Sequence, residues 1–203
     1  MAIFAGVDIG STTGKALLLD DRDKIVASTI MEVTTRPEKT ARICIDEVLK
    51  QAGLKEEAID FMVGTGYGRV KIPFASDNIS EITCHATGAK WLHPTVKTVV
   101  DIGGQDCKVI GVRDDGKVRE FVMNDKCAAG TGRFLESQAR VLNVRIDEFS
   151  EQSKKADSPA LISAQCSVFA ESEVITQLNE GNSIPNIVAG IHVAIASRLI
   201  SLL

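Results

Sequence analysis

A short pattern that occurs twice limits the folds open to this chain more than any other feature. Residues 8–15 have the sequence Asp-Ile-Gly-Ser-Thr-Thr-Gly-Lys, and residues 101–108 have the sequence Asp-Ile-Gly-Gly-Gln-Asp-Cys-Lys. Each copy runs into a short apolar stretch and predicts a strand, a glycine turn and a returning strand. Six identities coincide at this one spacing: Asp8/Asp101, Ile9/Ile102, Gly10/Gly103, Lys15/Lys108, Asp21/Asp114 and Lys24/Lys117.

The repeat extends to the predicted elements, because each half begins with three strands followed by a helix. In the first half we expect strands at Ile3–Asp8, Lys15–Leu19, Ile25–Glu32 and Ala58–Val63, with helices from Pro37 to Ala52 and from Ser80 to Trp91. In the second half we expect strands at Thr98–Asp101, Lys108–Val112 and Val118–Met123, with helices ending near Leu142, at Ile146–Lys154, from Val168 to Asn179 and over the last residues. This order predicts a duplicated α/β fold of two domains, residues 1–95 and 96–203, around a cleft.

The last predicted helix is still apolar at Leu202 and Leu203 and has no capping residue. The second half also lacks the later strand and helix that the first half contains. From this pattern we expect the C-terminal domain to be incomplete.

Composition excludes several classes of partner. The 203 residues carry a net charge of −4 and only 4% aromatic side chains, so no basic or base-stacking surface for nucleic acid is indicated. The N-terminus enters a strand directly, and no apolar run reaches the ~18 residues of a membrane span. We therefore expect a cytoplasmic protein that binds neither nucleic acid nor membrane.

Both predicted turns present backbone N–H groups beside a carboxylate, an arrangement that can hold a phosphate and its metal ion. Asp8 and Asp101 each end a strand, and we expect them to hold Mg²⁺ directly or through water. Gln105 is expected to orient an attacking water, because phosphoryl transfer depends on positioning and charge stabilisation. One Asp-x-Gly turn is a common structural feature, whereas two copies in register favour a nucleotide site.

The residues expected to contact phosphate lie in the two turns. They are Gly10, Ser11, Thr12 and Thr13 in the first turn, and Gly103, Gly104 and Gln105 in the second. Lys15 is expected to neutralise phosphate charge. The alternative, of nearly equal weight, is that Lys15 is simply a solvent-exposed strand residue without a role in binding.

The five cysteines are odd in number and form no C-x-x-C motif, which argues against a disulfide framework or a structural zinc site. Cys127 and Cys166 each precede a predicted helix, whose N-terminus favours a thiolate. Ordinary buried thiols are the alternative for both, and packing is the expected role of Cys44 and Cys107. Cys84 lies inside a predicted helix, where it shares no face with the adjacent histidine.

Two thiolates cannot complete an iron–sulfur cluster that needs four ligands. Two copies of the chain would supply four, so one hypothesis is a [4Fe–4S] cluster held by Cys127 and Cys166 at a homodimer interface. The helix N-termini would then stabilise the anionic cluster and offer N–H donors to its sulfurs.

Over essentially its whole length the chain resembles the ATP-dependent activators, or archerases, of 2-hydroxyacyl-CoA dehydratases, in the BadF/BadG/BcrA/BcrD ATPase family. That family includes ATPase subunits of benzoyl-CoA reductase and has the actin-like ATPase fold of acetate kinase, sugar kinases, Hsp70 and actin. The segments that carry the resemblance are Asp8–Thr12 with Lys15, Thr65–Arg69, Asp101–Asp106, Asn124–Phe134, Cys166 with Val168–Val174, and Val188–His192. The cysteine-containing segments are specific to the family, and the two Asp-Ile-Gly turns mark the wider superfamily.

The resemblance implies a homodimer with one [4Fe–4S] cluster held by Cys127 and Cys166 of both chains. It implies that ATP hydrolysis to ADP, with Mg²⁺, drives one electron from ferredoxin or flavodoxin to a dehydratase partner. It also implies an anaerobic host. Proteins of the family carry a further glycine-rich adenosine motif that is absent from these 203 residues.

Three other functions remain open at this point. One is an ATPase subunit of a benzoyl-CoA reductase. Another is a small-molecule kinase of the same fold, with Asp125 as the base. The third is a non-enzymatic module in which nucleotide only changes the shape of the protein. The kinase and the module need neither Cys127 nor Cys166.

Overall fold

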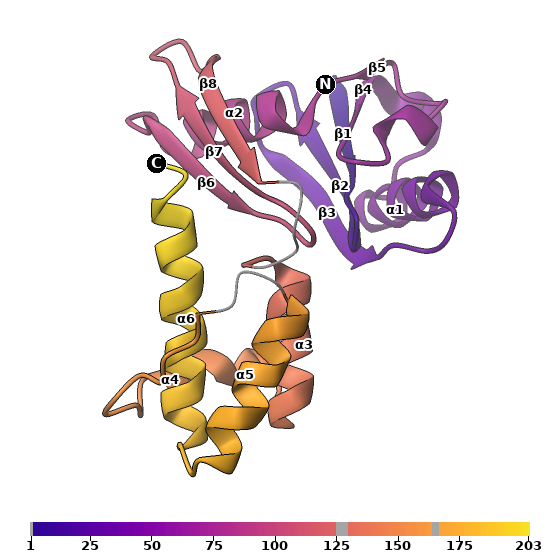
Figure 1. Cartoon of the computed structure of the whole chain (residues 1–203). Coiled ribbons are helices and arrows are strands. Elements are labelled where there is room, and N and C mark those ends of the chain that lie inside the picture. Colours follow the sequence, from indigo (N-terminus) through magenta and orange to yellow (C-terminus); the bar gives the residue numbers. More distant parts are fainter. Residues whose placement is uncertain (1, 125–129, 164–166) are drawn as a thin grey trace. The chain divides into compact units, whose positions relative to one another are not determined.

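A computed structural model describes residues 2–124, 130–163 and 167–203 (Figure 1). The chain divides into a first unit, Met1–Val96 with Arg113–Val118, and a second unit, Lys97–Val112 with Arg119–Leu203. Both contain strands and helices, so the predicted α/β class is confirmed. Within the described residues, no helix is both long and apolar enough to cross a membrane.

The first unit is built on a five-stranded sheet with the order β3-β2-β1-β4-β5. Its strands are β1 (Ile3–Ile9), β2 (Thr13–Asp20), β3 (Ile25–Glu32), β4 (Ile59–Thr65) and β5 (Asp77–Asn78). Its helices are α1 (Pro37–Ala52) and α2 (Glu81–Leu92), with 3₁₀ turns η1 (Glu56–Ala58) and η2 (Arg69–Lys71). β1 pairs antiparallel with β2 and parallel with β4.

The second unit combines a three-stranded sheet, in the order β6-β7-β8, with a cluster of helices. The strands are β6 (Thr98–Ile102), β7 (Cys107–Val112) and β8 (Val118–Asn124), and β6 pairs antiparallel with β7. The helices are α3 (Gly132–Leu142), α4 (Phe149–Ser153), α5 (Ser167–Asn179) and α6 (Ile184–Ile200), with the 3₁₀ turn η3 (Ile146–Glu148) before α4.

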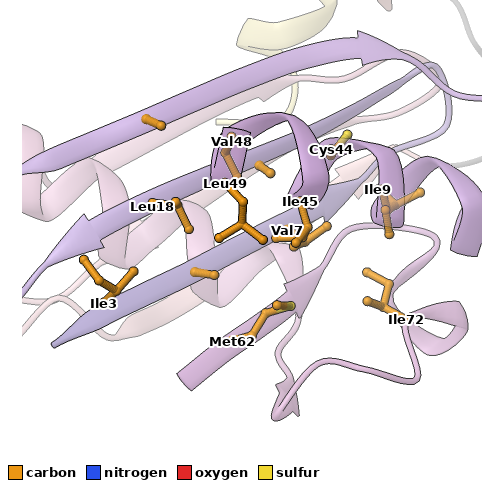
Figure 2. Packing of buried hydrophobic residues seen from close by; sticks show 14 residues of the cluster. Ile3, Val7, Ile9, Leu18, Cys44, Ile45, Val48, Leu49, Met62 and Ile72 are labelled. Carbon is orange, nitrogen blue, oxygen red and sulfur yellow. The ribbon is translucent and has the colours of Figure 1, made fainter. Parts of the chain in front are cut away.

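The core of the first unit follows from two periodicities. Alternate residues of β1 and β2 are buried, as a strand with one covered face requires. On α1 the buried side chains recur three and four residues apart and cover that face (Figure 2). The main contributors are Ile3, Val7, Ile9, Leu18, Cys44, Ile45, Val48 and Leu49. The expected packing role of Cys44 is thus observed, since its side chain is fully buried.

Local signals place the helix ends. Pro37 occupies the first turn of α1, and Gly53 ends the helix in the left-handed conformation with φ of 65°. The Ser80 side chain accepts a hydrogen bond from the Thr83 N–H and so caps α2. The sequence did not predict β5 or η2, which are too short to show a period, and the segment expected as one helix at 146–154 is divided between η3 and α4.

Gln138 is a buried polar residue on α3. Its side chain is fully buried, and neither amide atom has a partner among the described residues. Replacing Gln138 with methionine should therefore raise the free energy of unfolding by about 1–3 kcal/mol, because two unsatisfied polar atoms are removed at similar volume. Urea unfolding would measure the change, with the exposed Gln51→Met as the control. An unchanged or lower stability of Gln138→Met would contradict this expectation.

Candidate functional site

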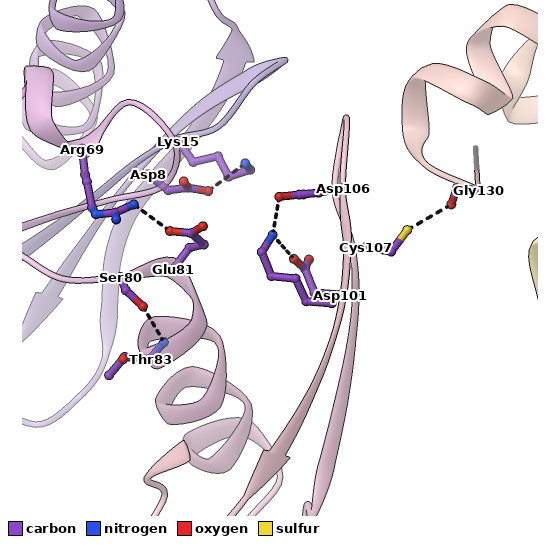
Figure 3. A network of polar contacts seen from close by, with 11 residues as sticks. Asp8, Lys15, Arg69, Ser80, Glu81, Thr83, Asp101, Asp106, Cys107 and Gly130 are labelled. Atoms are coloured by element: carbon purple, nitrogen blue, oxygen red, sulfur yellow. Dashed lines mark hydrogen bonds and ion pairs between the residues drawn. The ribbon is translucent and has the colours of Figure 1, made fainter. Parts of the chain in front are cut away.

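The hairpin of β1 and β2, called here the first hairpin, brings Asp8 and Lys15 together. The two residues are opposite each other in the strand register. The Lys15 Nζ lies 2.9 Å from Asp8 Oδ2 (Figure 3), and the lysine side chain is 42% exposed. The turn is closed by a hydrogen bond of 3.0 Å from the Gly10 N–H to the Thr13 carbonyl. Lys15 is therefore half solvated and ion-paired at once.

The hairpin of β6 and β7, called the second hairpin, repeats this geometry. Asp101 is opposite Lys108 in the register, as Asp8 is opposite Lys15. The Gly103 N–H donates to the Asp106 carbonyl at 2.9 Å. This bond corresponds to the one from the Gly10 N–H to the Thr13 carbonyl in the first hairpin. The repeat found in the sequence is thus a repeat of backbone hydrogen bonding.

Lys108 differs from Lys15 in burial and in its number of partners. Its side chain is only 4% exposed, and its Nζ lies 2.8 Å from an Asp106 carboxylate oxygen and 3.4 Å from one of Asp101. Burial alone would lower the pKa of Lys108, but the hydrogen bond to Asp106 and the charges of both carboxylates raise it above its ordinary value. Lys108 is consequently a charged, enclosed ammonium that ties the two ends of the turn together.

The other predicted phosphate contacts lie where the chain turns. Ser11, Thr12 and Thr13 are half-buried, and the Thr12 carbonyl accepts a hydrogen bond from the Val33 N–H at 2.9 Å. In the second hairpin Gly103 and Gly104 are half-buried and Gln105 is exposed at the tip. The exposed position of Gln105 leaves its amide accessible to solvent.

A glycine-spaced loop after β4 closes around the end of β1. Gly66 has φ of 85°, and a Cβ there would lie 2.2 Å from Asp8 Oδ1. The Gly68 N–H donates to the Ile9 carbonyl at 2.8 Å. The Arg69 guanidinium holds the loop in place, since it binds the Gly66 carbonyl at 3.0 Å. It also binds the Glu81 carboxylate at 2.9 Å (Figure 3). A side chain at Gly66 would displace the Asp8 carboxylate.

A cavity of about 930 Å³ lies within the first unit, over the sheet face that α1 does not cover. Asp8 and Lys15 line it, together with apolar residues of the strands such as Leu17 and Ile30. Residues of α2, including Cys84, complete the lining. The charged pair of the first hairpin therefore borders an apolar hollow.

The carboxylates suit a magnesium ion bound through water better than one bound directly. Asp8 gives one oxygen to Lys15, and Asp101 gives one oxygen to Lys108. An ammonium at this distance competes with a direct metal bond, whereas a hydrated Mg²⁺ retains its own waters. In the described part of the chain, no three His, Cys, Asp or Glu residues form a group that could hold a metal ion.

The two predicted cluster ligands, Cys127 and Cys166, lie outside the described residues. α5 begins at Ser167, directly after Cys166. The first two amides of α3, those of Gly132 and Arg133, donate to the carbonyls of Gly103 and Gly104. These two amides are already hydrogen-bonded, so they are not among the N–H donors that were expected to contact the sulfurs of a cluster. The donor set still fits a cluster, because two such chains would supply four thiolates.

Cys107 has a contact that the sequence did not indicate. It is buried, as its strand position suggested, and its thiol donates to the Gly130 carbonyl at 3.3 Å (Figure 3). Burial raises the pKa of the Cys107 thiol, and the charges of Asp106 and Asp101 raise it further. The thiol is therefore protonated at neutral pH and available as a donor.

Two contacts of the candidate site were not predicted from the sequence. Asp106 is assigned no function from the sequence. The repeat spacing of 93 residues aligns it with Thr13, so it is the one position at which the two turns differ in charge, and this difference could have identified it. The ion pair of Arg69 with Glu81 joins two different elements, the turn η2 and the helix α2. No spacing or motif in the sequence predicts this pair.

Comparison with known proteins finds similar sequences and similar structures. Residues 5–203 match the model of the BadF/BadG/BcrA/BcrD ATPase family. The chain is 49% identical over 193 residues to the activator of lactoyl-CoA dehydratase of Anaerotignum propionicum, covering 95% of this chain and 74% of that protein.

Two solved structures are also similar. One is component A of the Acidaminococcus fermentans (R)-2-hydroxyglutaryl-CoA dehydratase, with a TM-score of 0.95 and 45% identity over 100% of this chain and 78% of that one. The other is the activator of the 2-hydroxyisocaproyl-CoA dehydratase from Clostridium difficile with bound ADPNP. Its TM-score is 0.93, with 42% identity over 98% of this chain and 74% of that one. The predicted fold and the predicted resemblance are confirmed by these matches.

Proposed function

Because this chain belongs to the BadF/BadG/BcrA/BcrD ATPase family, we propose that it is the ATP-hydrolysing activator of a 2-hydroxyacyl-CoA dehydratase. The observation that carries the ATPase part is the matched pair of hairpins, each with the same turn bond and the same Asp–Lys pairing. The dehydratase part is supported by relatives that bear this name at 42–49% identity.

In this proposal the two hairpins bind the phosphates of ATP. Backbone amides of the glycine turns bind phosphate oxygens, and Lys15, half exposed, supplies positive charge. Asp8 and Asp101 hold Mg²⁺ through its waters, and exposed Gln105 orients the water that attacks the terminal phosphate. ATP and water are converted to ADP and phosphate.

The released free energy is proposed to drive the transfer of one electron. The electron comes from reduced ferredoxin or flavodoxin and passes to the dehydratase, so that the donor is oxidised by one electron and the dehydratase is reduced by one. A [4Fe–4S] cluster bridging a homodimer would supply the carrier, since it accepts and releases single electrons. Cys127 and Cys166 of both copies would hold it. We place this activity in the cytoplasm.

The proposal is tested by anaerobic reconstitution of the complete protein with iron and sulfide. We expect about four irons and four sulfides per dimer. We also expect ATP turnover to accompany electron delivery to an added dehydratase from reduced flavodoxin. Omission of ATP should stop the delivery while the iron content stays the same.

One outcome would favour the small-molecule kinase instead. If the reconstituted protein binds no iron but turns over ATP, and ADP release depends on a hydroxyl-bearing acceptor, the electron-transfer proposal is wrong. Cys127 and Cys166 would then have packing roles only.

A further inference from the structure

The second hairpin caps a helix with its own backbone. The first amides of a helix have no partner within the helix and are usually satisfied by a side-chain cap. Thr131, the N-cap residue of α3, makes no side-chain cap hydrogen bond. Instead the Gly132 N–H donates to the Gly103 carbonyl at 2.9 Å and the Arg133 N–H donates to the Gly104 carbonyl at 3.1 Å. The tip of the hairpin therefore takes the place of the cap.

This capping fixes the direction of the neighbouring amides. A trans peptide is planar, and its C=O and N–H point in opposite directions. The Gly103 carbonyl shares a peptide with the Gly104 N–H, and the Gly104 carbonyl shares one with the Gln105 N–H. Since both carbonyls face α3, the amides of Gly104 and Gln105 point away from it, and they belong to the residues expected from the sequence to contact phosphate.

Cys107 adds a third bond between the same two segments. Its thiol reaches the Gly130 carbonyl, two residues before α3 begins. The equivalent position in the first hairpin is Gly14, where a Cβ would lie 2.5 Å from the Thr40 side chain. The first hairpin thus has no room for a side chain at this point, and the second uses one as a tether.

α3 is itself joined to α5. The Ser137 hydroxyl of α3 donates a hydrogen bond to the Glu171 carboxylate of α5, and the two helices pack against each other. Hydrogen bonds therefore connect the second hairpin to α3, and α3 to α5, so that a movement of the hairpin can be transmitted to both helices. All of these contacts lie within the second unit.

We infer that Cys107 is a positioning residue that, with the Gly103 and Gly104 carbonyls, clamps the second hairpin to α3 and transmits phosphate binding to that helix. The inference rests on the proposed function, because it takes the bound phosphate to be that of a nucleotide. A phosphate bound to the Gly104 and Gln105 N–H groups restricts the motion of these two planar peptides. The Gly103 and Gly104 carbonyls belong to the same peptides, so their motion is restricted as well. The bonds to Gly132 and Arg133 are then strengthened, and α3 opens less often.

Hydrogen exchange of the complete protein, with and without Mg²⁺ and ADPNP, measures this transmission. In the unaltered protein, ADPNP should slow exchange of peptides covering residues 131–142 by at least about threefold. In Cys107→Ala the slowing should fall to less than about half of that value, while the Kd for ADPNP stays within about twofold. Cys107→Ser keeps a donor and should restore part of the response. Cys44→Ala, a matched change at a buried thiol of the first unit, should leave the response unchanged.

The outcomes separate this inference from the proposed function. If ADPNP binds but exchange of residues 131–142 in the unaltered protein does not change, the inference is wrong and nucleotide binding stands. A full response in Cys107→Ala would also overturn it. If ADPNP does not bind the unaltered protein, the proposed function fails and the inference fails with it. Hydrogen exchange of the unaltered protein needs no variant. The inference can therefore still be contradicted if the Cys107→Ala protein does not fold.

Discussion

Replacing Cys127 with serine is expected to abolish the iron–sulfur cluster while leaving nucleotide binding intact. In the proposed dimer each chain contributes two of the four thiolates, so one substitution per chain removes half of the ligands. Serine has no thiolate to offer, and two remaining cysteines cannot hold four irons. The proposed phosphate contacts lie in the two hairpins and do not include Cys127.

The measurement is iron and sulfide per dimer after anaerobic reconstitution, with ADPNP affinity measured on the same samples. We expect iron to fall from about four per dimer to near zero. Cys84→Ser is the matched control, because Cys84 is a half-buried thiol of the first unit that lines the cavity. Iron retained in Cys127→Ser, or lost equally in Cys84→Ser, would remove the basis for a cluster at Cys127.

Replacing Lys108 with methionine should cost about 3–5 kcal/mol of stability, since it leaves the carboxylates of Asp101 and Asp106 without their shared cation. The equivalent Lys15→Met, in the first hairpin, should cost less than about 1 kcal/mol, because both side chains of that pair are more exposed to solvent than Lys108 is. Denaturant unfolding of both variants gives the comparison. Equal losses at the two positions would show that the enclosure of Lys108 does not matter energetically.

The pH dependence gives a second measurement on Lys108. Its pKa is raised in the folded protein, so the folded state keeps a proton that the unfolded state releases above the ordinary value of 10.5. The stabilisation is therefore fully present below that pH and is lost as the pH rises through the folded value. The unaltered protein should lose stability in this alkaline range more steeply than Lys108→Met. Parallel profiles would contradict the shift.

The elements of this protein could be predicted because their signals are local. Short apolar stretches after the two glycine turns indicated the returning strands, and Pro37 and Ser80 marked helix starts. The repeat of Asp-Ile-Gly placed two hairpins and the candidate phosphate residues in them. Each of these signals is carried by a few neighbouring residues, so no knowledge of the rest of the fold was needed.

The sequence also suggested roles for residues that the described structure does not cover. Cys127 and Cys166 were singled out by their position before helices and by a resemblance, and their assignment as cluster ligands stays a prediction. α3 and α5 do begin shortly after these cysteines, at Gly132 and Ser167.

Only the tertiary structure distinguished the two lysines of the repeat. Lys15 and Lys108 stand in the same motif, yet one is half exposed and the other is enclosed by two carboxylates. The same holds for Cys107, whose bond to Gly130 joins residues far apart in the chain, and for the burial of Gln138. Burial and long-range hydrogen bonds depend on which segments fold against each other. Local sequence determined the hairpins of this protein, and tertiary packing decided which of their side chains are held and which are free to meet a ligand.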